Sequence, residues 1–305
     1  GSAVGSSSTE AFPAQNAPPA FSAAMRDECG CSPRWCRSSV SSARRRRVGA
    51  SSGMVTTLTC TNPQSKRIQH LDGIELLVHL ERLDLAHNDI SDTGPLNSLE
   101  HLQHIDLSYN ALKQINIAPG SHILAINVLN LSHNQIEHLD WAAKLARLER
   151  LSISHNRLTS LSPLSGLRNL TYLNVSGNRV QSLQPLSRLG QLSVLNASRN
   201  QISDVSSLAG KESMTALILA SNQITDIAPL IGNNQLNRLN LADNPLTDVD
   251  GIQSLHGLAN LDLASTQLES IDPIFGLGAL EHVSLDNNPA ISCQALMRLK
   301  SAVGN

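Results

Sequence analysis

The sequence predicts an α/β-type solenoid with a parallel β-sheet on its concave face and short 3₁₀ or extended returns on its convex face. The first observation behind this prediction is the pattern L-x-x-L-x-L-x-x-N, which occurs ten times along the chain. The second is its spacing, which is 22 residues at every step except one step of 24. The third is the composition, with 41% hydrophobic but only 2% aromatic residues. The residues that close the pattern are Asn88, Asn110, Asn134, Asn156, Asn178, Asn200, Asn222, Asn244, Thr266 and Asn288.

Each unit is predicted to contribute one short strand. When the first leucine of the pattern is position 1, positions 3 to 7 alternate polar and apolar residues, as around Leu173 and Val175. This period of two predicts positions 4 and 6 inward and positions 3, 5 and 7 outward. Because all units run in one direction, the strands must stack in parallel, and the rest of each unit must return across the opposite side.

The returns are predicted to be short 3₁₀ turns or extended segments. Proline fixes φ and lacks an N–H donor, which disfavours a long helix. Lys211 and Asn233 break the apolar pattern at position 20 of two consecutive units, and we expect them to loosen the convex side rather than to form a second contact surface. The prolines at position 16 are Pro95, Pro163, Pro185, Pro229 and Pro273.

The asparagine at position 9 is predicted to be part of the scaffold. Its side-chain amide can satisfy backbone groups of its own unit and of the next unit where the chain turns inward. Thr266 takes this place in the ninth unit and can replace only part of that bonding. The ninth turn is therefore expected to be less regular.

Composition divides the chain into four regions. Residues 1–53 hold seven arginines against three acidic residues and show no apolar period, which predicts a largely disordered Ser/Pro/Arg-rich tail, with room for a short N-cap helix. Within it, the run from Arg44 to Arg47 is interpreted as a solvated linker in preference to a basic address. Residues 54–79 are predicted to form a degenerate N-terminal capping repeat, residues 80–289 the regular repeats, and residues 290–305 a C-terminal cap.

The repeated unit resembles the leucine-rich repeat family, and specifically its 22-residue class, over residues 54–305. Residues 55–60 and 71–75 are similar to the N-terminal cap of bacterial internalin-like envelope proteins, and Asn287-Asn288-Pro289 followed by Cys293 is similar to their C-terminal segments. The repeats also resemble intracellular nischarin-type and phosphatase-regulator scaffolds. The resemblance implies a right-handed superhelix of about ten repeats plus caps. Both groups imply partner binding rather than chemistry.

The five cysteines cannot all pair within one chain, because their number is odd. By resemblance to the capped bacterial proteins, Cys60 would form a disulfide with Cys29, Cys31 or Cys36 if the protein is exported. We assign Cys60 to position 3 of the degenerate repeat, an outward or edge position. A zinc site is disfavoured, because C-x-C-x4-C followed 24 residues later by Cys60 fits no ordinary zinc spacing. Cys293, at position 14 of the last unit, is predicted to be a buried small hydrophobe.

The candidate binding residues occupy positions 3, 5 and 8, which the solenoid arranges in columns about 4.8 Å apart. Tyrosine and arginine carry much of the binding energy at interfaces, and the N-terminal half is richer in both. Position 7 is almost entirely Ala or Ser, which we expect to leave the floor of the groove open to a partner. The candidate partner-binding residues are Arg82, Asp84, His87, His104, Asp106, Tyr109, His133, Arg150, His155, Tyr172, Arg199 and Arg238.

Two pairs in these columns allow a chemical interpretation. His133 and His155 lie in adjacent units and would reach a shared metal or switch an interface near pH 6, but two histidines are an incomplete site. We therefore interpret them as exposed polar residues and predict no metal. Asp84 and Asp106 formally resemble an acid/base dyad, but Asp and Asn recur down their column, so polar strand residues are the favoured interpretation.

The sequence predicts a non-catalytic module that binds a protein partner on its concave face and uses no cofactor. It contains no P-loop, nucleophile elbow, zinc-protease helix or dinucleotide fingerprint. The net charge of −2 disfavours nucleic-acid binding, and no apolar run is long enough to span a membrane. A secreted or cell-envelope location is favoured over an intracellular scaffold or adaptor, and a monomer over an oligomer. Glycan binding is disfavoured because aromatic residues are scarce. Metal-dependent hydrolysis is disfavoured because the strand columns hold the polar groups apart instead of bringing them to one point.

Overall fold

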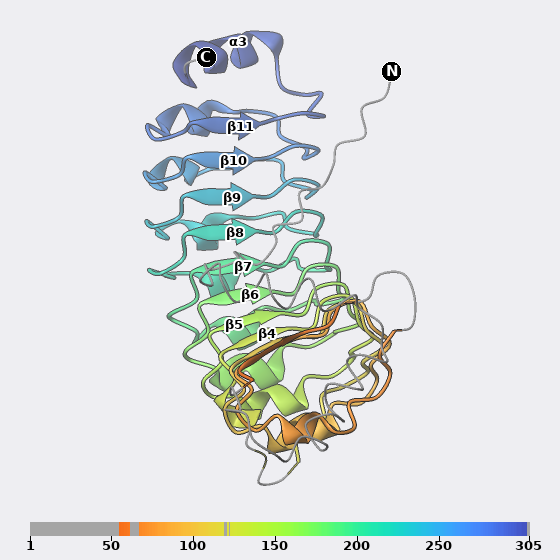
Figure 1. The fold of residues 1–305 in the computed structure, drawn as a ribbon. Helices are drawn as coiled ribbons and strands as arrows, with labels where there is room; N and C mark the ends of the chain where they lie inside the picture. The colour runs from red at the N-terminus through yellow and green to blue at the C-terminus, as the bar shows by residue number, and fades with distance from the viewer. Residues whose placement is uncertain (1–54, 62–66, 119–120, 122, 304–305) are drawn as a thin grey trace.

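The computed structural model describes residues 55–61, 67–118, 121 and 123–303. Within these residues, eleven three-residue strands form one parallel sheet in which each strand pairs with the next along the chain. Figure 1 shows the strands stacked along the solenoid, with the C-terminal helix beyond the last of them. The predicted solenoid is confirmed. The strands are β1 (Thr57–Thr59), β2 (Arg82–Asp84), β3 (His104–Asp106), β4 (Val128–Asn130), β5 (Arg150–Ser152), β6 (Tyr172–Asn174), β7 (Val194–Asn196), β8 (Ala216–Ile218), β9 (Arg238–Asn240), β10 (Asn260–Asp262) and β11 (His282–Ser284).

Short 3₁₀ helices return the chain between strands, as the prolines at position 16 predict. All five prolines lie at the first or second residue of such a helix, where φ is suitable and the missing N–H has no partner within the helix. The 3₁₀ helices are η1 (Ile74–Leu76), η2 (Gly94–Ser98), η3 (Ile123–Ala125), η4 (Asp140–Lys144), η5 (Ser162–Gly166), η6 (Gln184–Leu186), η7 (Ser206–Leu208), η8 (Ala228–Leu230), η9 (Ile252–Ser254) and η10 (Asp272–Gly276).

Positions 4 and 6 point into the core, as the alternation predicts. Leu173 in β6 and Val175 after it are fully buried, and Leu173 pairs in register with Leu195 of β7. Each buried leucine contributes about 1.5–3 kcal/mol through the removal of apolar surface from water. Because each repeat contacts mainly its neighbours, this stabilisation is distributed along the solenoid.

The asparagine at position 9 joins consecutive repeats. In Asn156, Nδ2 donates to the carbonyl oxygens of Ile153 and Ser154 in its own unit and of Leu131 in the preceding unit, at 3.2, 3.1 and 3.0 Å. Its Oδ1 accepts from the N–H of Ile136, also in the preceding unit, at 2.8 Å. The scaffold role is confirmed, but the expected direction was wrong: the backbone groups within reach belong to the preceding unit, not to the next one.

Thr266 replaces only part of this bonding, as predicted. Its Oγ1 lies 3.0 Å from the carbonyl oxygen of Leu263 and 2.6 Å from Oδ1 of Asn288. The N–H of Leu246, which would face an asparagine amide at position 266, donates instead to the carbonyl oxygen of Asn244 in its own unit.

The expectation that Lys211 and Asn233 loosen the convex side is wrong, because both residues are buried and bonded. Lys211 Nζ donates to the carbonyl oxygens of Leu186 and Ser187 at the end of η6, at 2.9 and 2.6 Å. The Lys211 N–H donates to Asn233 Oδ1, and Asn233 Nδ2 donates to the Leu208 carbonyl oxygen. Burial lowers the pKa of Lys211. The two polar side chains therefore connect neighbouring returns instead of separating them.

The first strand corrects the position of Cys60. Leu58 pairs with Leu83, so Cys60 lies at position 6 rather than at position 3, and it is buried in the core. The alternation of Leu58 and Cys60 in the sequence already fitted two inward positions. The disulfide stays a prediction, because its candidate partners lie outside the described residues: Cys29, Cys31 and Cys36. The predictions for residues 1–53, including Arg44 to Arg47, also lie outside them.

The C-terminal helix α3 (Cys293–Val303) follows the last repeat. Leu299 of this helix is buried, whereas Cys293 is exposed, so the prediction of a buried Cys293 is wrong. The repeat phase stops after Asn288, and the first residue of a helix occupies the place that a regular return would fill. No helix in the described part of the chain is long and apolar enough to cross a membrane.

Candidate protein-binding face

Position 8 turns the chain after every strand of the regular repeats. Its non-glycine residues have φ between 52° and 59°, and Gly177 has φ 65°. This left-handed conformation costs most L-residues roughly 1–2 kcal/mol, and it is easiest for Gly, Asn and Asp. The last repeats follow that preference in part, with Asp243 and Asn287. The first four regular repeats instead carry bulky rings at this position.

These four residues form a continuous stack, called the ring ladder: His87, Tyr109, His133 and His155. Successive ring centroids lie 4.2, 4.0 and 4.2 Å apart, and the planes differ by 9° to 13°. The separation is close to the spacing of about 4.8 Å between adjacent strands. Strand register thus brings together four of the predicted site residues in one column.

The ring ladder ends at Gly177. A Cβ atom at this residue would lie only 2.8 Å from Nδ1 of His155, so the His155 ring fills the space of the missing side chain. Gly210 has a similar φ of 64°, but a Cβ there would meet nothing within 4 Å. The sequence analysis placed these histidines in one column but did not predict that their rings stack. The pattern that indicates the stack is four ring residues at position 8 of consecutive repeats, followed by glycine at the same position.

The histidines of the ladder are not arranged as metal ligands. Stacked imidazoles hold their lone pairs side by side, so His133 and His155 do not converge on one point. In the described residues, no group of three or more His, Cys, Asp or Glu side chains is placed to hold a metal ion. Burial lowers the pKa of both residues; a charge on His155 or His87 lowers that of His133 further, and Arg199 lowers that of His155.

The carboxylates at position 5 brace the ends of the strands. Oδ1 of Asp84 accepts the N–H of Ala86 at 3.1 Å, and Oδ1 of Asp106 accepts the N–H of Ser108 at 2.8 Å. Asn130 Nδ2 donates to Oδ2 of Asp106 at 2.9 Å. Burial raises the pKa of Asp84, and the Ala86 N–H acts in the opposite direction. These bonds give both carboxylates a structural role, which agrees with the interpretation of Asp84 and Asp106 as polar strand residues.

Position 3 supplies the centre of the concave face. Arg150 in β5 and Tyr172 in β6 are paired in register, and the guanidinium carbon lies 4.3 Å from the ring centroid. His104 in the same column pairs with Arg82; burial and then the Arg82 charge lower the pKa of His104. Arg238 lies apart from these residues, in β9 near the C-terminal end.

The floor of the face is closed in its N-terminal half, contrary to the expectation for position 7, whereas Ser198, Ala220 and Ala264 are half-buried. The side chains of Ser108, Ser132 and Ser154 are buried under their neighbours. Ser132 and Ser152 also share a hydrogen bond between their hydroxyl oxygens at 2.8 Å. In the N-terminal half the surface therefore consists of ring edges and arginines rather than a deep groove.

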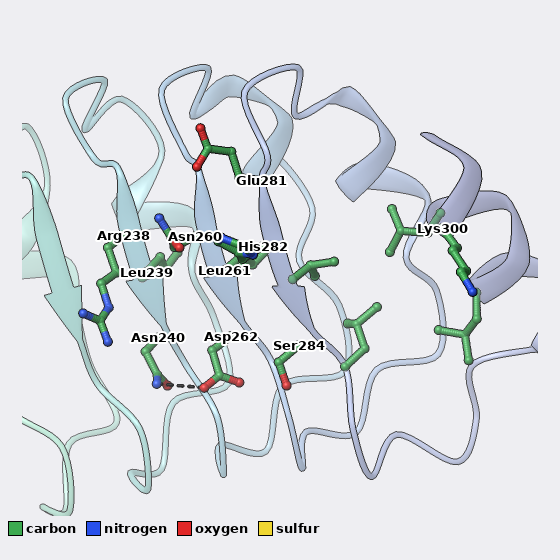
Figure 2. A pocket seen from close by; sticks show the side chains of 14 residues that line it. Arg238, Leu239, Asn240, Asn260, Leu261, Asp262, Glu281, His282, Ser284 and Lys300 are labelled. Atoms are coloured by element: carbon green, nitrogen blue, oxygen red, sulfur yellow. Dashed lines mark hydrogen bonds between the residues drawn. The ribbon is translucent and has the colours of Figure 1, made fainter. Parts of the chain in front are cut away.

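An open hollow of about 620 Å³ lies at the C-terminal end, between β9–β11 and α3. Figure 2 shows Arg238, Asn240 and Asp262 along the strands, with Lys300 of α3 on the other side. The Asn240 amide donates to Asp262 at 2.9 Å. Of the predicted site residues, the hollow contains only Arg238, and the ring ladder lies at the opposite end of the sheet.

Comparisons with known proteins agree with this architecture. The family model for leucine-rich repeats in two copies matches residues 78–119, 146–188 and 168–210, and a second leucine-rich repeat model matches residues 100–158. The comparison with curated proteins gave no match.

Solved structures give longer matches. Internalin C2 from Listeria monocytogenes is 31% identical, with 69% of this chain and 81% of that chain covered and a TM-score of 0.54. The internalin InlF from the same organism is 24% identical, with 87% of this chain and 91% of that chain covered and a TM-score of 0.62. Together with the repeat models and the eleven-stranded sheet, these matches show that the chain belongs to the leucine-rich repeat proteins and is of the internalin-like type.

Proposed function

We propose that this chain is a non-catalytic interaction module that binds a protein partner through the N-terminal half of its concave face. Leucine-rich repeat proteins of this kind are generally non-enzymatic protein-binding modules, so a binding role fits the family. We place the binding site in the N-terminal half of the concave face because the ring ladder lies there.

The ladder holds bulky rings where the backbone favours small residues. Glycine or asparagine at position 8 would relieve roughly 1–2 kcal/mol of strain in each repeat. Arg199, Ser221 and Ser265 hold the same backbone conformation, so the stacked rings, and not the strain, distinguish the N-terminal half. Tyr109 is 41% exposed, and its ring is already held by His87 and His133. A partner would therefore gain contact area at a small cost in side-chain entropy.

Arg150 and Tyr172 extend this surface to the centre of the sheet. Arg and Tyr are among the residues that most often dominate binding energy at interfaces. The cation–π contact between them restricts the Arg150 side chain before a partner arrives. The ladder and this pair thus form one pre-ordered surface over β2–β6.

The test compares two triple variants that change the same columns in different halves. A partner isolated by affinity purification is titrated against the wild type and both variants, each checked for folding by circular dichroism. The N-terminal variant carries Tyr109→Ala, Arg150→Ala and Tyr172→Ala, and the control carries Asp243→Ala, Arg238→Ala and Asn260→Ala. We expect the first to raise Kd at least about 30-fold, which corresponds to about 2 kcal/mol, and the second to change it less than about threefold. Equal effects of both variants would contradict a site in the N-terminal half.

Export is the second part of the proposal. It is supported by the inward position of Cys60 directly after β1, next to a core that a disulfide to an upstream cysteine would close. The test is intact mass after alkylation under denaturing, non-reducing conditions, on protein made in an oxidising compartment. A disulfide between Cys60 and Cys29, Cys31 or Cys36 is expected, and alkylation of all five thiols would overturn this part.

A further inference from the structure

Charge is distributed unevenly along the solenoid. Residues 144–199 contain eight Lys or Arg residues and one acidic residue, and we call them the central basic band. Residues 78–143 before it contain two basic and eight acidic residues. After the band, residues 200–238 contain two basic and three acidic residues, and residues 239–297 contain eight acidic residues and no Lys or Arg. The cations of the band are Lys144, Arg147, Arg150, Arg157, Arg168, Arg179, Arg188 and Arg199.

Three arginines of the band lie at the edge of the face where the ring ladder ends, from the repeat of His155 onward. Arg157 and Arg179 occupy position 10 of adjacent repeats, and Arg199 occupies position 8 of the next. All three are exposed. Their backbones are fixed in the solenoid, since the N–H groups of Arg157 and Arg179 donate to the preceding repeats at 2.9 and 2.8 Å. The three cations therefore belong to three consecutive repeats, at the edge where the strands end, and we call them the arginine row.

Internal partners neutralise this row only weakly. Arg157 is 3.3 Å from Glu137, but the two side chains are 50% and 56% exposed, and ion pairs so exposed to solvent are weak. Within the described residues, neither Arg179 nor Arg199 forms an ion pair. The charge of the row remains available to an incoming group.

We propose that the central basic band binds an acidic segment of the protein partner, with carboxylates placed against Arg157, Arg179 and Arg199. This inference rests on the proposed function and adds the chemistry of the partner. Arginine donates two parallel hydrogen bonds to a carboxylate, which suits a band in which seven of the eight cations are arginine. The acidic segments toward both ends of the solenoid repel an anion, which favours the band as its place of contact.

The same geometry favours an acidic protein segment over single-stranded nucleic acid. Proteins that bind single strands offer free aromatic faces on which bases stack. In the ring ladder the faces of Tyr109 and His133 are already stacked on their neighbours, so mainly ring edges are available. The acidic flanks also oppose a long phosphate chain.

The experiment measures binding of a fluorescent 20-residue oligoglutamate by anisotropy at low and at physiological salt. A heparin fragment and oligouridylate of similar charge are the competing probes. Two triple variants remove the same number of cations, and a third keeps the charge of the band. The band variant carries Arg157→Gln, Arg179→Gln and Arg199→Gln; the control carries Lys113→Gln, Arg238→Gln and Lys300→Gln; the rescue variant carries Arg157→Lys, Arg179→Lys and Arg199→Lys.

We expect oligoglutamate binding to weaken at least tenfold in the band variant, less than twofold in the control, and less than fivefold in the rescue variant. No binding at low salt, equal losses in both glutamine variants, or tighter band-dependent binding of heparin or oligouridylate would overturn the proposal. Arg150, Tyr109 and Tyr172 are unchanged in all three variants. If the oligoglutamate experiment fails but the alanine variant of those three residues still loses binding to the natural partner, the acidic-segment proposal is overturned and the proposed function is not.

Discussion

The N-terminal and C-terminal halves of the concave face share one backbone but carry different surfaces. Position 8 has nearly the same φ in both halves, and the strands keep one register throughout. The N-terminal half places a ring ladder on this backbone, whereas the last four repeats place Ser, Asp and Asn there and end in an open hollow. The scaffold is therefore set by the inward residues and the position 9 amide, so the outward columns are free to differ.

The largest expected difference between the halves is in that scaffold. Asn156→Ala should lower the free energy of unfolding by about 3 kcal/mol, because three carbonyl groups and one N–H lose a partner. Thr266→Ala removes a hydroxyl that serves fewer groups and should cost about 1 kcal/mol. Urea unfolding followed by circular dichroism measures both. Equal costs would show that the amide does not set the regularity of the turn.

The end of the ring ladder gives the next largest effect. Gly177→Ala should cost about 2 kcal/mol, because the new Cβ combines a left-handed backbone with the overlap on His155. Gly210→Ala has the same backbone conformation without the overlap and should cost about 1 kcal/mol. The difference between the two losses, measured by thermal unfolding, reports the contact with the ring.

The double variant Gly177→Ala/His155→Ala identifies the source of that difference. If the ring causes it, removing His155 should reduce the cost of Gly177→Ala to that of Gly210→Ala. A difference that persists without the ring would show that the ladder does not extend over Gly177.

The fold was predictable from the sequence because a one-residue shift would turn every leucine outward, so the period itself sets the register. The candidate columns were predictable from the same register. The contacts between side chains within a column were not predictable, because stacking in the ring ladder depends on side-chain rotamers and on the space at Gly177. Lys211 and Asn233 were misread for a related reason: a polar residue in an apolar column is tolerated only where backbone carbonyls happen to be within reach.

Repair of the ninth turn tests the scaffold from the opposite direction. Thr266→Asn should raise the free energy of unfolding by about 1 kcal/mol, since the amide would reach the carbonyl of Leu241 and the N–H of Leu246, as Asn244 does one repeat earlier. Asn156→Thr is the matched change in the other half and should be destabilising. If Thr266→Asn is neutral or destabilising in urea unfolding, the irregular turn is held by neighbouring residues rather than by the missing amide.

The smallest expected difference between the halves is a pH dependence. The pKa values of His133 and His155 are lowered in the folded chain, so the unfolded chain takes up protons first as the pH falls. Above the pKa of the unfolded chain, near 6.5, both histidines are neutral in either state and do not change the free energy of unfolding. This free energy falls as the pH drops from there toward the lower pKa values of the folded chain. The free energy of unfolding of the wild type should therefore decrease more between pH 7.5 and 5.5 than that of His133→Asn/His155→Asn.

Asparagine suits the left-handed backbone, so this variant removes the imidazoles without adding strain. Ser221→Asn/Ser265→Asn introduces the same residue at position 8 in the other half and keeps the ladder, so its pH dependence should match the wild type. Arg199 stays in all three proteins and continues to oppose a charge on His155 wherever that ring is present. Equal slopes in the wild type and the histidine variant would mean that protonated rings are accommodated in the stack, and that the ladder acts only as a contact surface.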